Sequence, residues 1–359
     1  MFQSSAIHSP DDPALDELCA QLAQRASELD VSQEWPSEQL RLCGEAGVYR
    51  WFVPPQYGGQ GWSDADIVRG YLRLSAACLT TTFIITQRTG AGQRIIASDN
   101  QVVIDRLLPG LLSGEKFLTV GISHLTTSRR HLARPVLDAR QSADGFVLDG
   151  YSPWVTGACH AETIVTGATL PDGRQILVAL PTDLPGVSVP LPPRLVGLSA
   201  SHTGPVHCKQ VALDGQWLLA GPVENVMQSG AGAGTGGLQT STLAVGLAAA
   251  ALDFLDKESI QRTELAKPAR ELRAEHAELT SDLLALASGV TVCSNDELRV
   301  RANSLVLRAT QAALAAAKGS GYVIGHPAGR WCREALFFLV WSCPQSVMAA
   351  NLCELAGME

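Results

Sequence analysis

The stretch that decides the fold is GFVLDGYSPWVTGACHAETIVTGA, residues 145–168, near the middle of this 359-residue chain. Apolar and polar residues alternate from Gly145 to Gly157, as expected for a β-strand with one buried face. Turn-forming Asp-Gly pairs punctuate the short runs rich in Val, Leu and Thr around it. These pairs are Asp144-Gly145, Asp149-Gly150, Asp172-Gly173 and Asp214-Gly215. The pattern predicts a small antiparallel β domain over roughly residues 117–215.

Helical patterns precede this β domain. Apolar residues recur at three- and four-residue spacing in Leu15–Ala26 and again in Ile67–Ala77, which predicts two amphipathic helices. Residues 53–62 lie between them and contain two prolines and three glycines, so they cannot continue a helix. The first third of the chain is therefore predicted to be helical, with a stiff connecting loop.

Long helical runs rich in Ala and Leu follow the β domain and predict a four-helix bundle. The expected helices are Leu238–Arg262, Glu271–Ser288, Asp296–Lys318 and about Pro327–Leu355. We therefore predict an α+β multidomain chain. Its expected parts are an N-terminal helical domain (1–115), a middle antiparallel β domain (116–228) and a C-terminal four-helix bundle (229–359).

Composition argues against several classes of partner. The net charge is −8, and the 27 basic residues form no stripe that would neutralise a nucleic-acid backbone. The first thirteen residues, MFQSSAIHSPDDP, lack the basic and apolar regions of a secretory signal, and no run of about 18 apolar residues occurs. We therefore expect a cytoplasmic protein with no nucleic-acid or membrane partner.

The cysteines do not form a recognisable framework. Nine are scattered without a CxxC motif, which favours reduced, mostly buried thiols over disulfides. The eight histidines never fall at ligand spacing beside a cysteine pair, so the sequence predicts no zinc site and no other metal site.

Five segments in a fixed order resemble the acyl-CoA dehydrogenase family over about residues 35–355. The second is the stretch at residues 145–168, similar to the family pattern N-G-x-K-x-W-I-T-N-A. The other four are WPSEQLRLCGEAGVYRWFVPPQYGGQGWS (35–63), GLSASHTGPVHCKQVALDG (197–215), TLAVGLAAAALDFLDKESIQR (242–262) and GSGYVIGHPAGRWCREA (319–335). Each match is weak alone, but five in the same order are specific.

The resemblance implies FAD bound between the β domain and the bundle, usually in a homodimer or homotetramer. Trp154 and Thr156 fall where the family's tryptophan and threonine border the flavin ring. An indole packs well against such a ring, and a hydroxyl can donate to it. The alternative is a tryptophan that faces a β core and a threonine on the surface.

Arg262 falls where the resemblance places an arginine on the FAD pyrophosphate, a contact that suits a guanidinium. The match is incomplete, because the family's next Phe-Gly pair is Leu265-Ala266 here and its later glutamine falls at about Arg273. A solvated arginine at a helix end is the alternative.

Ser123 and His124 fall where the family has a backbone-contact residue and a threonine near the flavin. They precede a loop that reads T-E-P-G-A-G-S-D in the family and runs from His124 to His131 here, with two arginines. Ser128 and Arg130 of this loop are predicted to bind substrate, because a positive loop favours an anionic ligand or reduced flavin. The alternative is a basic loop that simply faces water.

The family's catalytic glutamate is missing from its usual position. Counting from Arg333-Glu334-Ala335 places Ser342 there, between Trp341 and Cys343, and a serine cannot remove an α-proton unaided. The second family source of a base, residues 230–242, contains no acidic residue. The catalytic residue is therefore unknown from the sequence.

Two further features near these positions have competing interpretations. Cys343 is a candidate nucleophile or redox thiol, although an inert buried thiol is the commoner case. The residues Gly232, Gly234 and Gly237 spell GxGxxG, but they follow no strand of a βαβ unit, so we predict an interdomain loop and not a dinucleotide site.

Three functional hypotheses follow. The first is an FAD-dependent oxidoreductase that acts on an acyl thioester and passes electrons to a separate electron-transfer partner. The second is a reduced-flavin-dependent monooxygenase of the same fold, which needs a flavin reductase but no α-proton base. The third is a non-catalytic member of the family that acts as an assembly partner.

Overall fold

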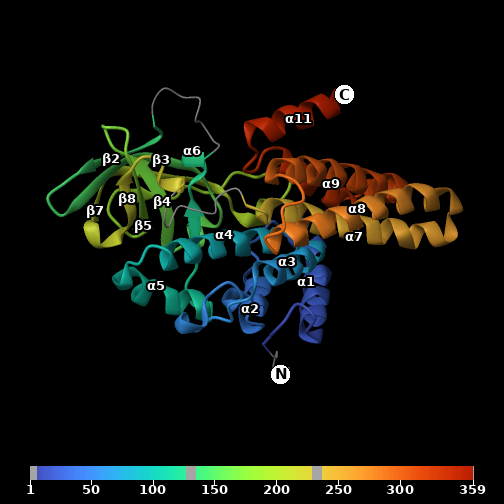
Figure 1. Cartoon of the computed structure of the whole chain (residues 1–359), viewed down its shortest axis with the longest axis horizontal. Helices are drawn as coiled ribbons and strands as arrows, with labels where there is room; N and C mark the ends of the chain where they lie inside the picture. Colours follow the sequence, from blue (N-terminus) through green and yellow to red (C-terminus); the bar gives the residue numbers. More distant parts are fainter. Residues whose placement is uncertain (1–5, 127–134, 229–236, 359) are drawn as a thin grey trace.

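The computed structural model describes residues 6–126, 135–228 and 237–358. Figure 1 shows three parts: a β-sheet at the left, long helices at the right, and N-terminal helices below both. The predicted order of helices, then β structure, then helices is confirmed.

Within the described residues, no helix combines the length and apolar character needed to cross a membrane. The nine cysteines are free thiols.

The N-terminal part is built from helices of which all but the last share one apolar core, whereas the last packs into the core of the sheet. These helices are α1 (Pro13–Ser32), α2 (Ser37–Glu45), α3 (Asp64–Ala77), α4 (Leu79–Ile96) and α5 (Gln101–Ser113). Helix α1 begins where the Asp12 carboxylate accepts a hydrogen bond from the Ala14 N–H at 3.0 Å, with Pro13 at the first helical position. Both helices predicted in this part are confirmed, and each begins two or three residues earlier than expected.

The loop between α2 and α3 is stiff, as its prolines and glycines predicted. The Trp51 and Trp62 rings stack with centroids 4.2 Å apart, and the Trp62 N–H donates to the Trp51 carbonyl at 2.7 Å. Gly59 packs so closely that a Cβ there would lie 1.8 Å from the Val53 carbonyl oxygen. Only glycine fits at that point of the loop.

The middle part is one sheet with strand order β6-β7-β3-β2-β4-β5-β8, and β1 pairs with β4. The strands are β1 (Leu118–Gly121), β2 (Leu137–Gln141), β3 (Gly145–Val155), β4 (Thr163–Thr169), β5 (Gln175–Pro181), β6 (Val187–Ser188), β7 (Gly204–Asp214) and β8 (Leu218–Val223). The short helix α6 (Ser123–Thr126) follows β1.

The sheet is mixed, not purely antiparallel as expected. Most neighbouring strands are antiparallel, but β4 runs parallel to β1 and to β2. The chain passes through β2 and β3 before it returns as β4, which is the long connection that parallel strands require. Asp149-Gly150 is also not a turn, because Gly150 has a φ of 124° inside β3 at an irregularity of the β3–β7 register.

The C-terminal part consists of α7 (Gln239–Gln261), α8 (Ala266–Ala287), α9 (Asn295–Ala317), α10 (Pro327–Ala335) and α11 (Gln345–Leu355). The helices predicted at α7 and α9 are confirmed to within one residue at each end. The single helix expected over about Pro327–Leu355 is wrong. It is broken because Ser342 has a φ of 43° and Pro344 lacks an N–H to donate.

The N-terminal and C-terminal parts meet where α3 packs against α7. A Cβ at Gly246 of α7 would lie 2.6 Å from the Leu72 carbonyl oxygen of α3. The Ser75 hydroxyl of α3 donates to the Leu243 carbonyl of α7 at 2.7 Å. The two helices therefore approach at backbone distance, which requires glycine at position 246.

We expect Gly246→Ala to lower the free energy of unfolding by about 1–2 kcal/mol, because overpacking against a backbone oxygen outweighs the helix propensity of alanine. Gly319→Ala is the matched control, since nothing lies within 4 Å of a Cβ at that glycine. Urea unfolding of both variants measures the difference. A Gly246→Ala protein as stable as the wild type would contradict the close approach of α3 and α7.

Candidate functional site

A cavity of about 1120 Å³ lies where the three parts meet. Among the described residues, its walls come from α3 and α4, the end of β1 and α6, the end of β3, residues 195–203 before β7, the start of α7, the end of α8, and residues 333–342 at and after the end of α10. Ligand pockets of drug-sized molecules measure about 300–1,000 Å³. The cavity is therefore large enough for an extended ligand.

The sheet side of the cavity carries a row of hydroxyl groups. The Thr156 hydroxyl lies 3.0 Å from that of Thr203, which lies 2.8 Å from that of Ser201. The Ser123 hydroxyl also lines the cavity, is buried, and makes no hydrogen bond within the described residues. Trp154 lies on the same wall with its indole half exposed. This wall therefore offers a ligand several hydroxyl groups and one aromatic ring.

His124 points away from the cavity. Its ring Nε2 lies 2.8 Å from the Gly167 carbonyl oxygen of β4, and burial lowers its pKa. The ring is therefore neutral and donates its Nε2 proton inside the sheet part. His124 is not among the described cavity-lining residues, and the predicted substrate residues Ser128 and Arg130 lie outside the described residues.

The opposite wall is aromatic and includes the predicted base position. The Trp341 ring stacks on Phe337 with centroids 4.9 Å apart, and Phe83 of α4 packs edge-on against Trp341 at 4.8 Å. Ser342 lines the cavity directly after Trp341. Cys343 is not among the described lining residues, and burial raises the pKa of its thiol.

Buried polar side chains of α9 hold this aromatic wall in place. The Arg299 guanidinium donates to the carbonyls of Phe338 at 3.3 Å and Trp341 at 2.9 Å. The Asn303 amide donates to the same Phe338 carbonyl at 3.1 Å. These bonds satisfy carbonyls left unpaired where the helix breaks, and they fix the turn that presents Ser342.

Among the described residues, the cavity wall carries a single carboxylate. Asp64, exposed at the first residue of α3, is the one acidic residue among the described lining residues. Glu334 lies behind the wall, where its carboxylate is 3.7 Å from the Arg330 guanidinium and both groups are buried. Burial raises the pKa of Glu334 to about 7. Its neighbour Arg333 does line the cavity and pairs with Asp30 of α1.

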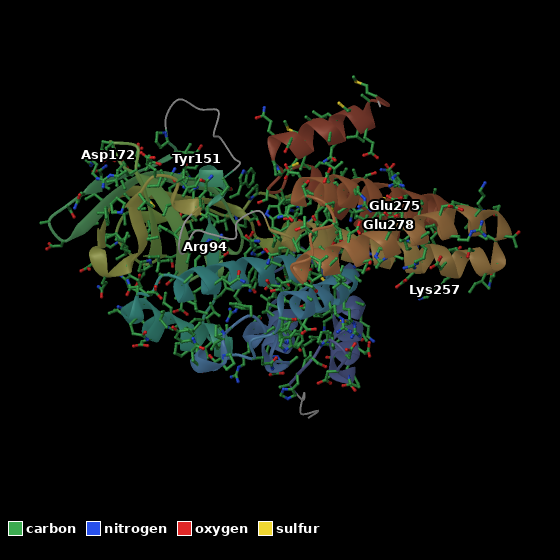
Figure 2. All side chains as sticks on the ribbon, viewed as in Figure 1. Arg94, Tyr151, Asp172, Lys257, Glu275 and Glu278 are labelled. Atoms are coloured by element: carbon green, nitrogen blue, oxygen red, sulfur yellow. The ribbon has the colours of Figure 1, made fainter. Side chains whose placement is uncertain are left out.

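Arg94 is a charged residue of the cavity that the sequence analysis missed. It lies near the end of α4, is 7% exposed, and donates to the Gly90 carbonyl at 2.8 Å. Figure 2 labels it near the point where the sheet meets the helices. Burial lowers its pKa to about 10, so the guanidinium stays charged at neutral pH.

No local pattern of residues singles out Arg94 in the sequence. Two arginines lie six residues apart on α4, and helical geometry turns them to different faces. Arg88 packs over the Tyr49 ring at 4.1 Å and donates to the Leu111 carbonyl, away from the cavity. Arg94 faces the cavity, a direction set by how α4 packs.

Arg262 lies apart from the cavity, and the glycine motif lies only partly within the described residues. Arg262 is held by Glu258 at 3.3 Å, Glu264 at 3.4 Å and the Ala316 carbonyl at 2.6 Å, and it is not among the described lining residues. Its proposed pyrophosphate contact stays a prediction. In the glycine motif, Gly237 lines the cavity, whereas residues 232 and 234 lie outside the described residues.

Comparisons with known proteins agree on one family. The family model described as "Acyl-CoA dehydrogenase, N-terminal domain" matches residues 13–115. The probable acyl-CoA dehydrogenase YngJ of Bacillus subtilis is 25% identical over 71% of this chain and 68% of its own length.

Solved structures agree in fold. A glutaryl-CoA dehydrogenase in complex with glutaryl-CoA has a TM-score of 0.81 at 18% identity and covers 97% of this chain and 96% of its own. A glutaryl-CoA dehydrogenase of Mycobacterium smegmatis in complex with FADH2 has a TM-score of 0.79 at 16% identity with the same coverage.

The buried Glu334 predicts a pH-dependent stability. Its carboxyl keeps its proton in the folded state up to about pH 7, whereas in the unfolded chain it loses the proton near pH 4.3. Stability from this group is thus complete below about pH 4.3 and falls as the pH rises to 7.

We expect Glu334→Gln to remove this dependence. The free energy of unfolding of the wild type relative to the variant should fall by about 1–3 kcal/mol between pH 4.5 and 8. Urea unfolding across that range measures it, with Glu17→Gln on the exposed face of α1 as the control. A constant difference, or one that rises with pH, would show that Glu334 is ionised throughout.

Proposed function

We propose that this chain is an FAD-dependent oxidoreductase of the acyl-CoA dehydrogenase family that acts on an acyl thioester; its N-terminal domain matches the family model and its fold is similar to that of a glutaryl-CoA dehydrogenase. The observation that carries the proposal is the cavity at the junction of the three parts, with hydroxyl groups on the sheet side and aromatic rings opposite. Two walls of such different character suit a flavin ring on one side and an apolar acyl chain on the other.

The residues on the sheet side fit a flavin. The buried Ser123 hydroxyl has no partner within the described residues, and a buried polar group normally has one. Thr156 and Ser123 would donate hydrogen bonds to the ring's nitrogen and carbonyl acceptors, and Trp154 would pack beside it. When bound, FAD supplies the acceptor for a hydride from the substrate.

The base for an α-proton has few possible sources in this chain. Residues 1–5, 127–134 and 229–236 contain no Asp or Glu, and the described wall offers Asp64 alone. The Ser342 hydroxyl cannot take the proton without a partner base. Glu359 also lies outside the described residues, so dehydrogenation by this chain relies on Asp64, on Glu359, or on a group that the substrate or another subunit brings.

The same observation favours a second candidate function. A reduced-flavin-dependent monooxygenase needs no α-proton base, so a wall without a buried carboxylate is compatible with its chemistry. Two assays separate the candidates. Anaerobic bleaching of the flavin by a panel of acyl-CoAs supports dehydrogenation, whereas turnover that requires oxygen and a flavin reductase supports oxygenation. A protein that fails to bind flavin would instead be a non-catalytic member.

The charge of Arg94 narrows the substrate class. A guanidinium buried in a cavity attracts a carboxylate more strongly than an exposed one, because little water screens the pair. The cavity carries this cation next to an apolar wall. We infer that the preferred acyl group bears a carboxylate or another anionic group.

Thr156→Val should lower the reduction potential of the bound flavin, because it removes a hydroxyl that stabilises the reduced ring. The purified wild type should be yellow, with the visible absorbance of oxidised flavin. Thr291→Val is the control, since Thr291 is exposed in the turn between α8 and α9. The measurement is the potential from dye-coupled reduction. A colourless wild type after reconstitution with FAD, or an unchanged potential in Thr156→Val, would contradict the assignment.

Arg94→Gln should weaken binding of an acyl-CoA with a terminal carboxylate by at least about tenfold, since one charge-assisted contact to a carboxylate is lost. Binding of the neutral acyl-CoA of equal chain length should change much less, and Arg94→Lys should recover part of the loss. Anaerobic titration of the flavin absorbance measures both affinities, and circular dichroism checks the fold. Equal losses for the charged and neutral ligands would remove Arg94 from the site.

A further inference from the structure

A second group of chemically reactive side chains lies apart from the cavity. Cys159 and His160 belong to the 3-10 turn Ala158–His160 after β3, and His202 follows the 3-10 turn Ser199–Ser201 before β7. The Cys159 sulfur and one nitrogen from each ring all lie within 4.8 Å of one another. None of the three residues is among those that line the cavity.

The hydrogen bond from His202 to a backbone carbonyl leaves the second nitrogen of its ring unprotonated. Its Nε2 lies 3.1 Å from the Gln33 carbonyl oxygen just after α1, and a carbonyl can only accept, so Nε2 carries the proton. The Nδ1 lone pair then points to the His160 Nε2 at 2.9 Å and the Cys159 sulfur at 3.8 Å. A histidine that binds a metal typically donates its other N–H to a carbonyl in this way.

The His160 ring is also held in position. It stacks on Trp35 with centroids 4.1 Å apart and an interplanar angle of 19°. Partial burial and the neighbouring His202 lower the pKa of His160, so at neutral pH its ring is uncharged. A neutral imidazole is the form that a metal binds.

We propose that Cys159, His160 and His202 form a binding site for a divalent transition metal, with Zn²⁺ as the preferred ion. One thiolate and two imidazoles are a ligand set that zinc favours, and the exposed side chains of Cys159 and His160 leave a fourth position for water. Ligand atoms at zinc distances lie roughly 3.4–3.8 Å apart in a tetrahedron. The two ring nitrogens at 2.9 Å would need to separate by about half an ångström, which the exposed His160 side chain permits.

The protons balance on binding. In the metal-free state the His160 Nε2–H donates to the His202 Nδ1. The ion takes the place of that proton, which moves to the His160 Nδ1, and the Cys159 thiol releases its own proton to solvent. One proton is thus released for each ion bound.

The site would link loops that carry the cavity wall. Cys159 follows Thr156-Gly157 by two residues and His202 precedes Thr203, and the Thr156 and Thr203 hydroxyls line the cavity. The Gly157 N–H already donates to the Ser201 and His202 carbonyls at 3.0 and 3.2 Å. A bound ion would therefore fasten these two loops to each other beside the cavity.

Cobalt titration of the chelator-treated full-length protein tests the proposal. Co²⁺ should give the thiolate charge-transfer and tetrahedral d–d bands at one equivalent with release of one proton, and Zn²⁺ should displace it with no further release of protons. Cys159→Ser should abolish the thiolate band, and His202→Ala should weaken binding at least about a hundredfold. Cys353→Ser and His207→Ala, both at exposed positions, are the matched controls and should bind as the wild type does.

A second measurement guards against a variant that fails to fold. Zn²⁺ should raise the melting temperature of the wild type and of both controls, and it should leave that of Cys159→Ser unchanged. Two results would overturn the proposal: Co²⁺ binding without a thiolate band, or equal affinities in the wild type and Cys159→Ser. The cluster would then be a hydrogen-bonded histidine pair only. Neither readout depends on flavin, so this test is independent of the proposed enzyme function.

Discussion

The close approach of α3 and α7 is the constraint on which the rest of the structure depends. Because Gly246 lacks a side chain, the backbone of α7 can lie against α3, and the Ser75–Leu243 hydrogen bond ties the two together. This contact fixes the bundle relative to the N-terminal helices. Helix α4, which follows α3 after one residue, can then contribute to the cavity between the sheet and the bundle.

The sequence predicted the elements whose signal is local. The pattern of apolar residues predicted the bounds of α7 and α9 to within one residue. The periodic spacing of apolar residues that indicates a long helix lies within the helix itself, so it can be found without knowing the fold. The break near Ser342 and the parallel pairing of β1 with β4 were missed. Pro344 is a local signal for the break that the prediction did not use, and Arg299 and Asn303 hold the broken segment. The parallel pairing depends on strands distant in the sequence, which are joined through β2 and β3.

The residues of the candidate site show the same difference between what a local pattern predicts and what depends on the folded chain. A family resemblance aligns backbone positions, and Trp154, Thr156 and Ser342, which it singled out, line one cavity, although their roles there stay predictions. It did not specify where side chains point, so His124 turned out to face Gly167. Residues without a counterpart in the resemblance were not found at all. Cys159 and His202 are 43 positions apart, and only the folded chain shows that they meet.

The charge of Arg94 and the residue at position 342 bear on each other, because both residues line the same cavity. If a glutamate stood at position 342 in the same water-poor space as the Arg94 guanidinium, each charge would offset part of the other's cost of burial. Here a serine lines the wall, and Arg94 keeps its charge with a pKa of about 10. A negatively charged group of a ligand would interact favourably with this buried guanidinium, because little water screens the pair. The serine at position 342 and the charge of Arg94 are therefore both consistent with the proposal that the ligand carries an anionic group.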